Sequence, residues 1–471
     1  MKRLKYALMA FLIAAIFSIA VVTCDDTITT ETTYVVIVGD LPIEFAWHDG
    51  RTDCPECYSV YATVRTPKED YDYGPYLFEF GGVTLEDVLA GSDQEVIVWV
   101  TESTGSTKET GAIYHGVAEH VPVTADVTND PETITLYPRG WYEVVLNQPS
   151  VDWGLKSVRM VGEGQGWIAG WDTEAGRGVI YRGIENTWGL QLPDAAPANW
   201  RLDSIDGGSG STAWAVGEDA GGGAGLILRY NGEFWYDDDD EPTISDPWRL
   251  KGVSFATDGG GWAVGETDTV GGAHEPVVLR YSSGTWVETD VPAGSVSLSD
   301  VFALDGGEAL MGGFDGTTPE AGLPAYWNGS AYEYPTATFE ACGGSPWEVQ
   351  DVYALSPNDW WAAATCTDEY GIVMHYNGAI IVESPVVTDE NWALGGIWAN
   401  GSGEAWAVGS SDTRPLVLHR EGGEWSIVTP DDALTGWKIY SVDFATDGWG
   451  YAVGRNTDAN SGLLLRYPFP K

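Results

Sequence analysis

The sequence predicts an all-β protein in which a small β-sandwich domain precedes a seven-bladed β-propeller. Two observations support this expectation. The segment FATDGGGWAVG (255–265) returns almost unchanged as FATDGWGYAVG (444–454), and weaker copies lie between them. The 471 residues also include 60 glycines and 23 tryptophans. Glycine-rich turns between short aromatic strands are typical of all-β folds.

The last residue of the repeated segment serves as an anchor along the chain. It recurs at intervals of about 45 to 51 residues, as Gly170, Gly217, Gly265, Gly313, Ala364, Gly409 and Gly454. Each interval holds four apolar or aromatic runs, such as LKGV (250–253), WAVG (262–265), VVLRY (277–281) and a run led by Trp286. Four strands in a repeat of this length predict one propeller blade, and seven anchors predict seven blades.

The two ends of the repeat region predict how the ring closes. The last repeat stops after LLLRY (463–467) and lacks a fourth strand. Residues 139–147, ahead of the first repeat, are similar to the fourth strands elsewhere. We predict that they complete the last blade and leave no open sheet edge, within a propeller domain of residues 138–471. Residues 33–137 predict a sandwich of six or seven strands with a short helical turn at LEDVL (85–89).

The pattern D-G-W-A-V-G … G-x-I-L-R-Y-N-G-x-x-W resembles the sialidase-type and photosystem II assembly-factor-type propellers of exported bacterial proteins. The resemblance covers residues 139–471 and implies the fold. Turns such as NGEFW (231–235) lack the Ser and Asp of the Asp box that sialidase-like families carry, so activity is left open. In the front domain, residues 76–100 resemble transthyretin-like domains, with an Ig-like sandwich as the other form. This resemblance implies a spacer or accessory binding module.

The N-terminus predicts export. Basic residues precede an apolar run from Ala7 to Val22, which is typical of a signal peptide over residues 1–23. The segment VVTC (21–24) resembles a lipobox, although Thr23 departs from it, so we expect lipid on Cys24 and a linker over 24–32. The alternative is ordinary cleavage and secretion. We therefore predict a cell-envelope lipoprotein, on the periplasmic or cell-surface side, or a secreted protein.

The charge of the chain restricts its partners. A formal net charge of −47 repels nucleic acid and anionic membrane surfaces. We expect a monomer that meets the membrane only through the lipid anchor. Divalent cations, calcium above all, are the candidate small partners of so many carboxylates.

One acidic position recurs just after each anchor. In a four-stranded meander, the loop between strands two and three lies on the same face as the connection between blades. We name this the variable-loop face, because its loops are long and irregular, and name the other the tight-turn face. The recurring acids fall on the variable-loop face, as Asp172, Asp219, Asp268, Asp315, Asp368, Asp412 and Asp458. They form a candidate ring for cations or a basic partner. The alternative is that each Asp starts its loop by bonding to nearby backbone.

Two further clusters are candidates for metal binding or cross-linking. The acidic run Asp237, Asp238, Asp239 and Asp240 is a candidate calcium site, with a solvated loop as the alternative. Four cysteines remain besides Cys24, as Cys54, Cys57, Cys342 and Cys366. In an exported protein they predict disulfides rather than half of a zinc site.

The sequence contains no catalytic motif such as HExxH or GxSxG. His375 and His419 occupy the third-strand position of Arg229, Arg280 and Arg466, which indicates a structural role. We predict a non-enzymatic binding or scaffold protein without a cofactor, which recognises a protein or a glycan through the variable-loop face. The alternative is a glycan-active enzyme of the sialidase-like type, with two carboxylates converging in the channel.

Overall fold

The computed structural model describes residues 38–467, with gaps. The gaps are residues 48–58, 67–69, 78–81, 102–111, 125–128, 130–131, 139, 163, 185–186, 194–198, 210–211, 220, 222, 239–241, 243, 245–246, 269–273, 316–320, 323, 335–341, 343–344, 367–369, 384–386, 388–390, 413, 429–435 and 446–447. The chain divides into two units, Met1–Arg139 and Gly140–Lys471. All the regular elements of the described residues are β-strands.

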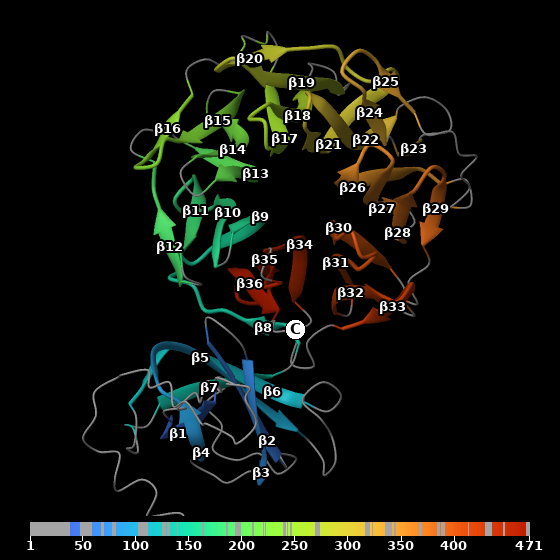
Figure 1. Cartoon of the computed structure of the whole chain (residues 1–471). Helices are drawn as coiled ribbons and strands as arrows, with labels where there is room; N and C mark the ends of the chain where they lie inside the picture. Colours follow the sequence, from blue (N-terminus) through green and yellow to red (C-terminus); the bar gives the residue numbers. More distant parts are fainter. Residues whose placement is uncertain are drawn as a thin grey trace, which may run out of the picture. The chain divides into compact units, whose positions relative to one another are not determined.

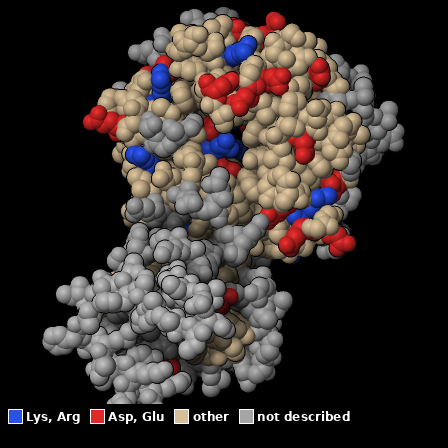
Figure 2. Space-filling view, in the orientation of Figure 1, with Lys and Arg blue, Asp and Glu red and all other residues tan. Residues whose placement is uncertain are grey.

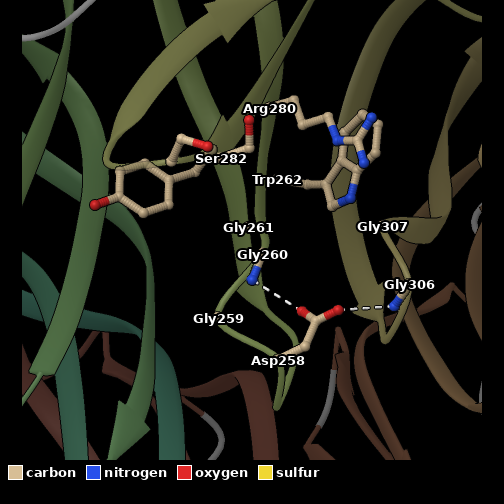
Figure 3. Close-up of a pocket in the computed structure, with 11 residues that line it drawn as sticks. Asp258, Gly259, Gly260, Gly261, Trp262, Arg280, Ser282, Gly306 and Gly307 are labelled. Atoms are coloured by element: carbon tan, nitrogen blue, oxygen red, sulfur yellow. Dashed lines mark hydrogen bonds between the residues drawn. The ribbon is translucent and has the colours of Figure 1, made fainter.

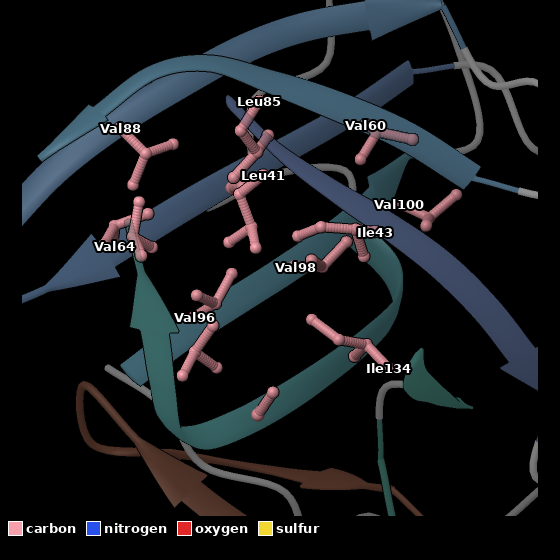
Figure 4. Close-up of a cluster of buried hydrophobic side chains, with 14 residues drawn as sticks. Leu41, Ile43, Val60, Val64, Leu85, Val88, Val96, Val98, Val100 and Ile134 are labelled. Carbon is pink, nitrogen blue, oxygen red and sulfur yellow. The ribbon is translucent and has the colours of Figure 1, made fainter. Parts of the chain in front are cut away.

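The first unit is one sheet of seven strands in the described residues, in the order β3-β2-β5-β6-β7-β1-β4. The strands are β1 (Val38–Trp47), β2 (Ser59–Arg65), β3 (Asp70–Leu77), β4 (Gly82–Leu89), β5 (Gly91–Thr101), β6 (Ala112–Val123) and β7 (Glu132–Pro138). The β6–β7 register covers only Tyr114↔Pro138 and His115↔Tyr137. Strands on both sides of this short junction contribute to one buried cluster, which includes Leu41, Val60 and Val98 (Figure 4).

The expected helical turn at residues 85–89 is wrong, because this segment is strand β4. Leu85 and Val88, three residues apart as on one face of a helix, are both fully buried. They pair with Leu41 and Gly39 of β1, and the register shifts between these two partners. A β-bulge therefore turns both side chains toward the core, although an odd spacing along a regular strand would place them on opposite faces.

The second unit forms seven sheets of four or five strands in the described residues, arranged around a common centre (Figure 1). The first three are β9 (Trp153–Gly162), β10 (Gln165–Asp172), β11 (Arg177–Ile184) and β12 (Thr187–Gln191); β13 (Trp200–Ser209), β14 (Thr212–Asp219), β15 (Ala224–Tyr230) and β16 (Trp235–Asp237); and β17 (Trp248–Phe255), β18 (Gly261–Asp268), β19 (His274–Ser282) and β20 (Thr285–Glu288).

The next three sheets follow the same antiparallel meander. They are β21 (Ser295–Leu304), β22 (Glu308–Asp315), β23 (Ala321–Gly322), β24 (Ala325–Trp327) and β25 (Tyr332–Glu333); β26 (Trp347–Ser356), β27 (Asp359–Cys366), β28 (Gly371–Tyr376) and β29 (Ile380–Glu383); and β30 (Trp392–Ala399), β31 (Ala405–Ser411), β32 (Pro415–Glu421) and β33 (Glu424–Ile427). The last consists of β34 (Trp437–Phe444), β35 (Gly450–Asn456), β36 (Ser461–Tyr467) and β8 (Tyr142–Glu143).

Segments from the two ends of the second unit meet in this last sheet. Tyr142 and Glu143 of β8 pair with Arg466 and Leu465 of β36. The amide of Val144 also donates to the carbonyl of Leu464, at 2.8 Å. The segment before the first repeat thus supplies the outer strand of the last sheet.

Adjacent sheets are held together by aromatic side chains packed between them. One cluster joins Trp167 of β10 to Trp200, Tyr230 and Trp235 of the β13–β16 sheet. Trp167 lies 5.2 Å from Trp235, edge to face. Aromatic pairs of this kind add to the free energy of burying their surface, so each sheet is stabilised mainly by its two neighbours.

Candidate functional site

A β-bulge occurs at the same position in the innermost strand of every sheet in the second unit. In β17, for example, the register passes from Leu250 directly to Gly252, so that Lys251 has no partner on β18. A bulge bends its strand and re-aims the extra side chain. The bulge residues are Lys156, Asp203, Lys251, Ser299, Gln350, Gly395 and Tyr440.

The bulge explains the anchor glycine of the repeat. A Cβ atom added to Gly265 would lie 2.0 Å from the carbonyl oxygen of Arg249, at the bulge. The equivalent distances at Gly217 and Gly409 are 2.0 and 1.9 Å. Backbone approaches this close leave no room for a side chain. Ala364 is the exception among the anchors.

Four cations gather near one end of the channel, and we name Lys156, Arg201, Arg249 and Lys251 the basic cluster. Each lies within the first four residues of its innermost strand, β9, β13 or β17. These strands begin at the connection between sheets, so the cluster lies toward the variable-loop face. Figure 2 shows basic side chains at the centre of the ring.

Acids hold three members of this cluster in place. Arg201 Nε lies 3.0 Å from Glu218 Oε1, and Lys251 Nζ lies 2.8 Å from Glu266 Oε2. Arg249 also pairs with Glu266. Burial tends to raise the pKa of Glu266, but the hydrogen bonds from Lys251 and Ser297 and the nearby positive charge lower it to about 2.

Lys156 differs from the other cations. Its ammonium lies 4.8 Å from the ring centre of Tyr440, and it has no hydrogen-bond partner among the described residues. Burial lowers the pKa of Lys156, and the charges of Lys251 and Arg201 lower it further, against the opposite effect of Asp203 and Asp351. The cluster therefore contains one cation whose three N–H donors remain unused within the described chain.

Other polar side chains of the innermost strands satisfy the backbone of the next sheet. Asp206 Oδ2 accepts from the amide of Phe255, at 2.7 Å, and Asp351 Oδ2 accepts from the amide of Ile397, at 2.6 Å. Ser204 Oγ does the same for the amide of Val253, at 3.2 Å. An innermost strand is a sheet edge with unpaired amides, so these bonds tie adjacent sheets together.

The opposite end of the channel is lined by aromatic rings. Phe302 lies 4.8 Å from Tyr353, and Tyr353 lies 6.0 Å from Trp398. Arg159 lies beside Phe302 and pairs with Asp206, at 2.9 Å. The two ends of the channel therefore differ, since the basic cluster lies at one and aromatic rings lie at the other.

Asp300 and Asp351 are hydrogen-bonded to each other. Burial raises the pKa of Asp300 well above its usual value, and the charge of Asp351 raises it further. Burial also raises the pKa of Asp351. Two carboxyl groups in contact share a proton, because both cannot ionise at low cost.

This pair predicts a pH dependence of stability. An acid whose pKa is raised on folding stabilises the folded state below its unfolded pKa, and this contribution is lost as the pH rises through the folded pKa. We expect Asp300→Asn, whose amide still donates to Asp351, to be more stable than the wild type at pH 8, by a difference that grows as the pH rises from 4 to 8. Urea unfolding between pH 4 and 8 measures this. A difference between the two proteins that does not grow with pH would contradict it.

Two of the recurring acids of the variable-loop face, Asp172 and Asp219, bond to nearby backbone. Asp172 is buried and its Oδ1 accepts from Ser150 Oγ at 2.6 Å and from the amide of Ala175 at 3.0 Å. Asp219 Oδ1 accepts from the amide of Gly221, at 2.9 Å. These bonds match the loop-starting alternative.

The other acids of this set differ in their surroundings. Asp412 accepts from the side-chain amide of Asn391, at 2.9 Å, and Asp458 is exposed. The side chains of Asp268 and Asp315, and Asp368 altogether, lie outside the described residues. The cation-binding role of the acids stays a prediction.

The remaining candidates are only partly described. Cys342 and Cys366 form a disulfide, while Cys24, Cys54 and Cys57 lie outside the described residues. Asp239 and Asp240 also fall outside them, and the amide of Asp238 donates to the carbonyl of Ile227, at 2.9 Å. No group of three or more metal-binding side chains occurs within the described part of the chain.

A pocket of about 410 Å³ opens on the tight-turn face, between the β17–β20 and β21–β25 sheets (Figure 3). Trp262 and Arg280 form one wall, and the guanidinium lies 5.2 Å from the indole centre. Asp258 forms another wall and accepts from the amides of Gly260, at 2.9 Å, and Gly306, at 2.8 Å. These two bonds lower the pKa of Asp258, with a smaller contribution from Arg280, so its carboxylate is charged.

Sequence reasoning missed the basic cluster and this pocket. The cluster has a signal, because Lys, Asp and Lys follow the first Leu in LKSV (155–158), LDSI (202–205) and LKGV (250–253). The sequence also holds a signal for the pocket, because the segment 255–265 has Gly260 at the position where the nearly identical segment 444–454 has Trp449.

These sheets define a β-propeller, and the comparison with solved structures agrees. Neither a family model nor a curated protein matches the sequence. The chain is similar to an inactive variant of virginiamycin B lyase from Staphylococcus aureus, solved with quinupristin, with a TM-score of 0.50 and 10% identity over 70% of this chain and 100% of that one. At this identity the likeness shows the fold alone.

Two other similar structures have lower scores. YCF48 bound to D1 peptide gives a TM-score of 0.49 and 15% identity, over 70% of this chain and 96% of that one. A lectin from Aleuria aurantia in complex with alpha-methyl-L-fucoside gives 0.41 and 11%, over 61% of this chain and 100% of the lectin. Within the described residues, no helix is long and apolar enough to cross a membrane.

Proposed function

We propose that this protein is a non-enzymatic binding or scaffold protein that recognises a protein or a glycan through its variable-loop face. We also propose a ring of seven blades, which the seven sheets and the pairing of β8 with β36 support. The N-terminal sequence supports export, with lipid on Cys24.

The observation that carries the binding role is the basic cluster. In a chain of net charge −47, cations from three separate repeats meet at the variable-loop end of the channel. No described residue accepts a hydrogen bond from the ammonium of Lys156, and Tyr440 lies beside it. Donors of this kind bind carboxylate, carbonyl or hydroxyl oxygens, which proteins and glycans both provide. Rigid strands hold the donors in place, as a binding site requires.

The alternative, a glycan-active enzyme, needs two carboxyl groups roughly 5 to 9 Å apart around the scissile bond. Asp300 and Asp351 do not supply this arrangement, because they are hydrogen-bonded to each other. Each also accepts a backbone amide, from Val352 and Ile397 respectively. These bonds give the pair a structural role between sheets.

Array binding tests the proposal. Peptide and glycan arrays are probed with the wild type and with the double variant Lys156→Ala/Arg201→Ala. We expect the ligands that bind the wild type to lose at least about tenfold in affinity, the equivalent of 1.4 kcal/mol. Arg229→Ala removes a positive charge at the tight-turn end of β15, away from the variable-loop face, and serves as the control.

Two outcomes would contradict the proposal. Ligands that bind the double variant as tightly as the wild type would exclude the basic cluster as the site. Release of shorter glycans, detected by mass spectrometry of the array eluate, would favour the enzyme.

A further inference from the structure

The repeat places one side chain over the third-strand residue of most sheets. It belongs to the residue two positions before the aromatic or apolar residue of the second strand that pairs with this third-strand residue. Asp359 Oδ1 lies 2.9 Å from His375 Nε2, and Glu404 Oε1 lies 3.1 Å from His419 Nε2. Glu308 accepts from the hydroxyl of Tyr326 in the same way. We name this place the covering position.

In the last sheet the covering position holds a tryptophan. The guanidinium of Arg466 lies 3.6 Å from the ring centre of Trp449 and 5.8 Å from that of Tyr451. An arginine with two aromatic rings around it is a favourable cation–π arrangement. The last sheet thus shows that an aromatic ring fits over an arginine at the covering position.

The β17–β20 sheet has the same pair of an arginine and a second-strand aromatic residue, but it has no side chain at the covering position. Arg280 pairs with Trp262 across β18 and β19, as Arg466 pairs with Tyr451 across β35 and β36. The covering position is Gly260, and the pocket opens there. Arg280 makes no hydrogen bond or ion pair with any described residue, and its guanidinium contacts Gly307, where an added Cβ atom would lie 2.0 Å away.

We propose that this pocket binds a planar aromatic ring, presented as a Trp or Tyr side chain by a protein partner. The ring takes the place over Arg280 that the indole of Trp449 takes over Arg466, so that the guanidinium lies between it and Trp262. The charged carboxylate of Asp258 repels anionic ligands and accepts from an indole N–H or a phenol O–H. This site lies on the tight-turn face and goes beyond the function proposed above.

Binding of a small probe tests the site on the full chain. The probe is N-acetyl-tryptophanamide, followed by saturation-transfer NMR, with dissociation constants on the order of millimolar, as a single ring implies. We expect Gly260→Trp, which fills the pocket from within, to weaken binding at least about tenfold. Arg280→Lys keeps the charge but loses the flat face, and we expect intermediate binding.

The matched variant Trp449→Gly opens the equivalent place over Arg466. We expect it to gain a second site for the probe, and the double variant Gly260→Trp/Trp449→Gly to have one site, moved to the last sheet. If Trp449→Gly fails to fold, the comparison of the wild type with Gly260→Trp still tests whether the pocket over Arg280 binds the probe.

Three results would overturn the proposal. They are equal binding by wild type and Gly260→Trp, no binding by the wild type, and tighter binding of N-acetyl-glutamate amide than of the tryptophan probe. None of them bears on the basic cluster, which lies toward the other face and is tested with different variants.

Discussion

Replacing Trp141 with alanine is expected to lower the free energy of unfolding of the propeller unit by about 3 to 5 kcal/mol, the usual cost of removing a buried tryptophan. The side chain is 2% exposed. It packs 5.6 Å from Trp406, 5.9 Å from Phe444 and 5.3 Å from Tyr467, measured between ring centres. One side chain therefore fixes β8 to the last sheet and to its neighbour.

Urea unfolding followed by circular dichroism and by tryptophan fluorescence measures this effect. Val145, four residues further on, is 86% exposed, so Val145→Ala should change stability by less than about 0.5 kcal/mol. A loss below 1 kcal/mol for Trp141→Ala would show that β8 does not hold the chain ends together. Loss of β8 also exposes the edge of β36, and we expect aggregation to accompany unfolding.

The elements of the propeller could be predicted well from the sequence because the same pattern of strands and turns recurs in each repeat. Seven copies of the anchor and its flanking strands average out the local ambiguity that a single strand carries. The front domain has no repeat, and there residues 85–89, expected to form a helical turn, belong to a strand with a β-bulge. Tertiary pairing with β1 decided the outcome.

The candidate site could be predicted less well, for a physical reason. Acids were the obvious candidates in a chain with 70 Asp and Glu, yet Asp206 and Asp351 bond to backbone amides of the next sheet. Which side chains converge depends on the bulge, and a bulge is a property of the pairing between two strands. Lys156 and Lys251 are far apart in the sequence and meet only because each sheet turns the same position inward.

The anchor glycine gives the second large expected effect. Gly265→Ala places a methyl group 2.0 Å from the Arg249 carbonyl oxygen. The backbone must move to relieve this contact, and overpacking of this kind costs about 3 kcal/mol. The move would also shift Lys251, so the ion pair of Lys251 with Glu266, now 2.8 Å, would lengthen.

The chain supplies its own control for this substitution. Ala364 occupies the anchor position of β27 and pairs with Val349 beside the bulge of β26, so that sheet already has room for a methyl group. We expect Ala364→Gly to cost only about 1 kcal/mol, the backbone-entropy cost of glycine. Urea unfolding of the two variants compares them directly. Equal costs at the two positions would mean that the anchor is a general small-residue site, and that glycine is not what allows the bulge to form.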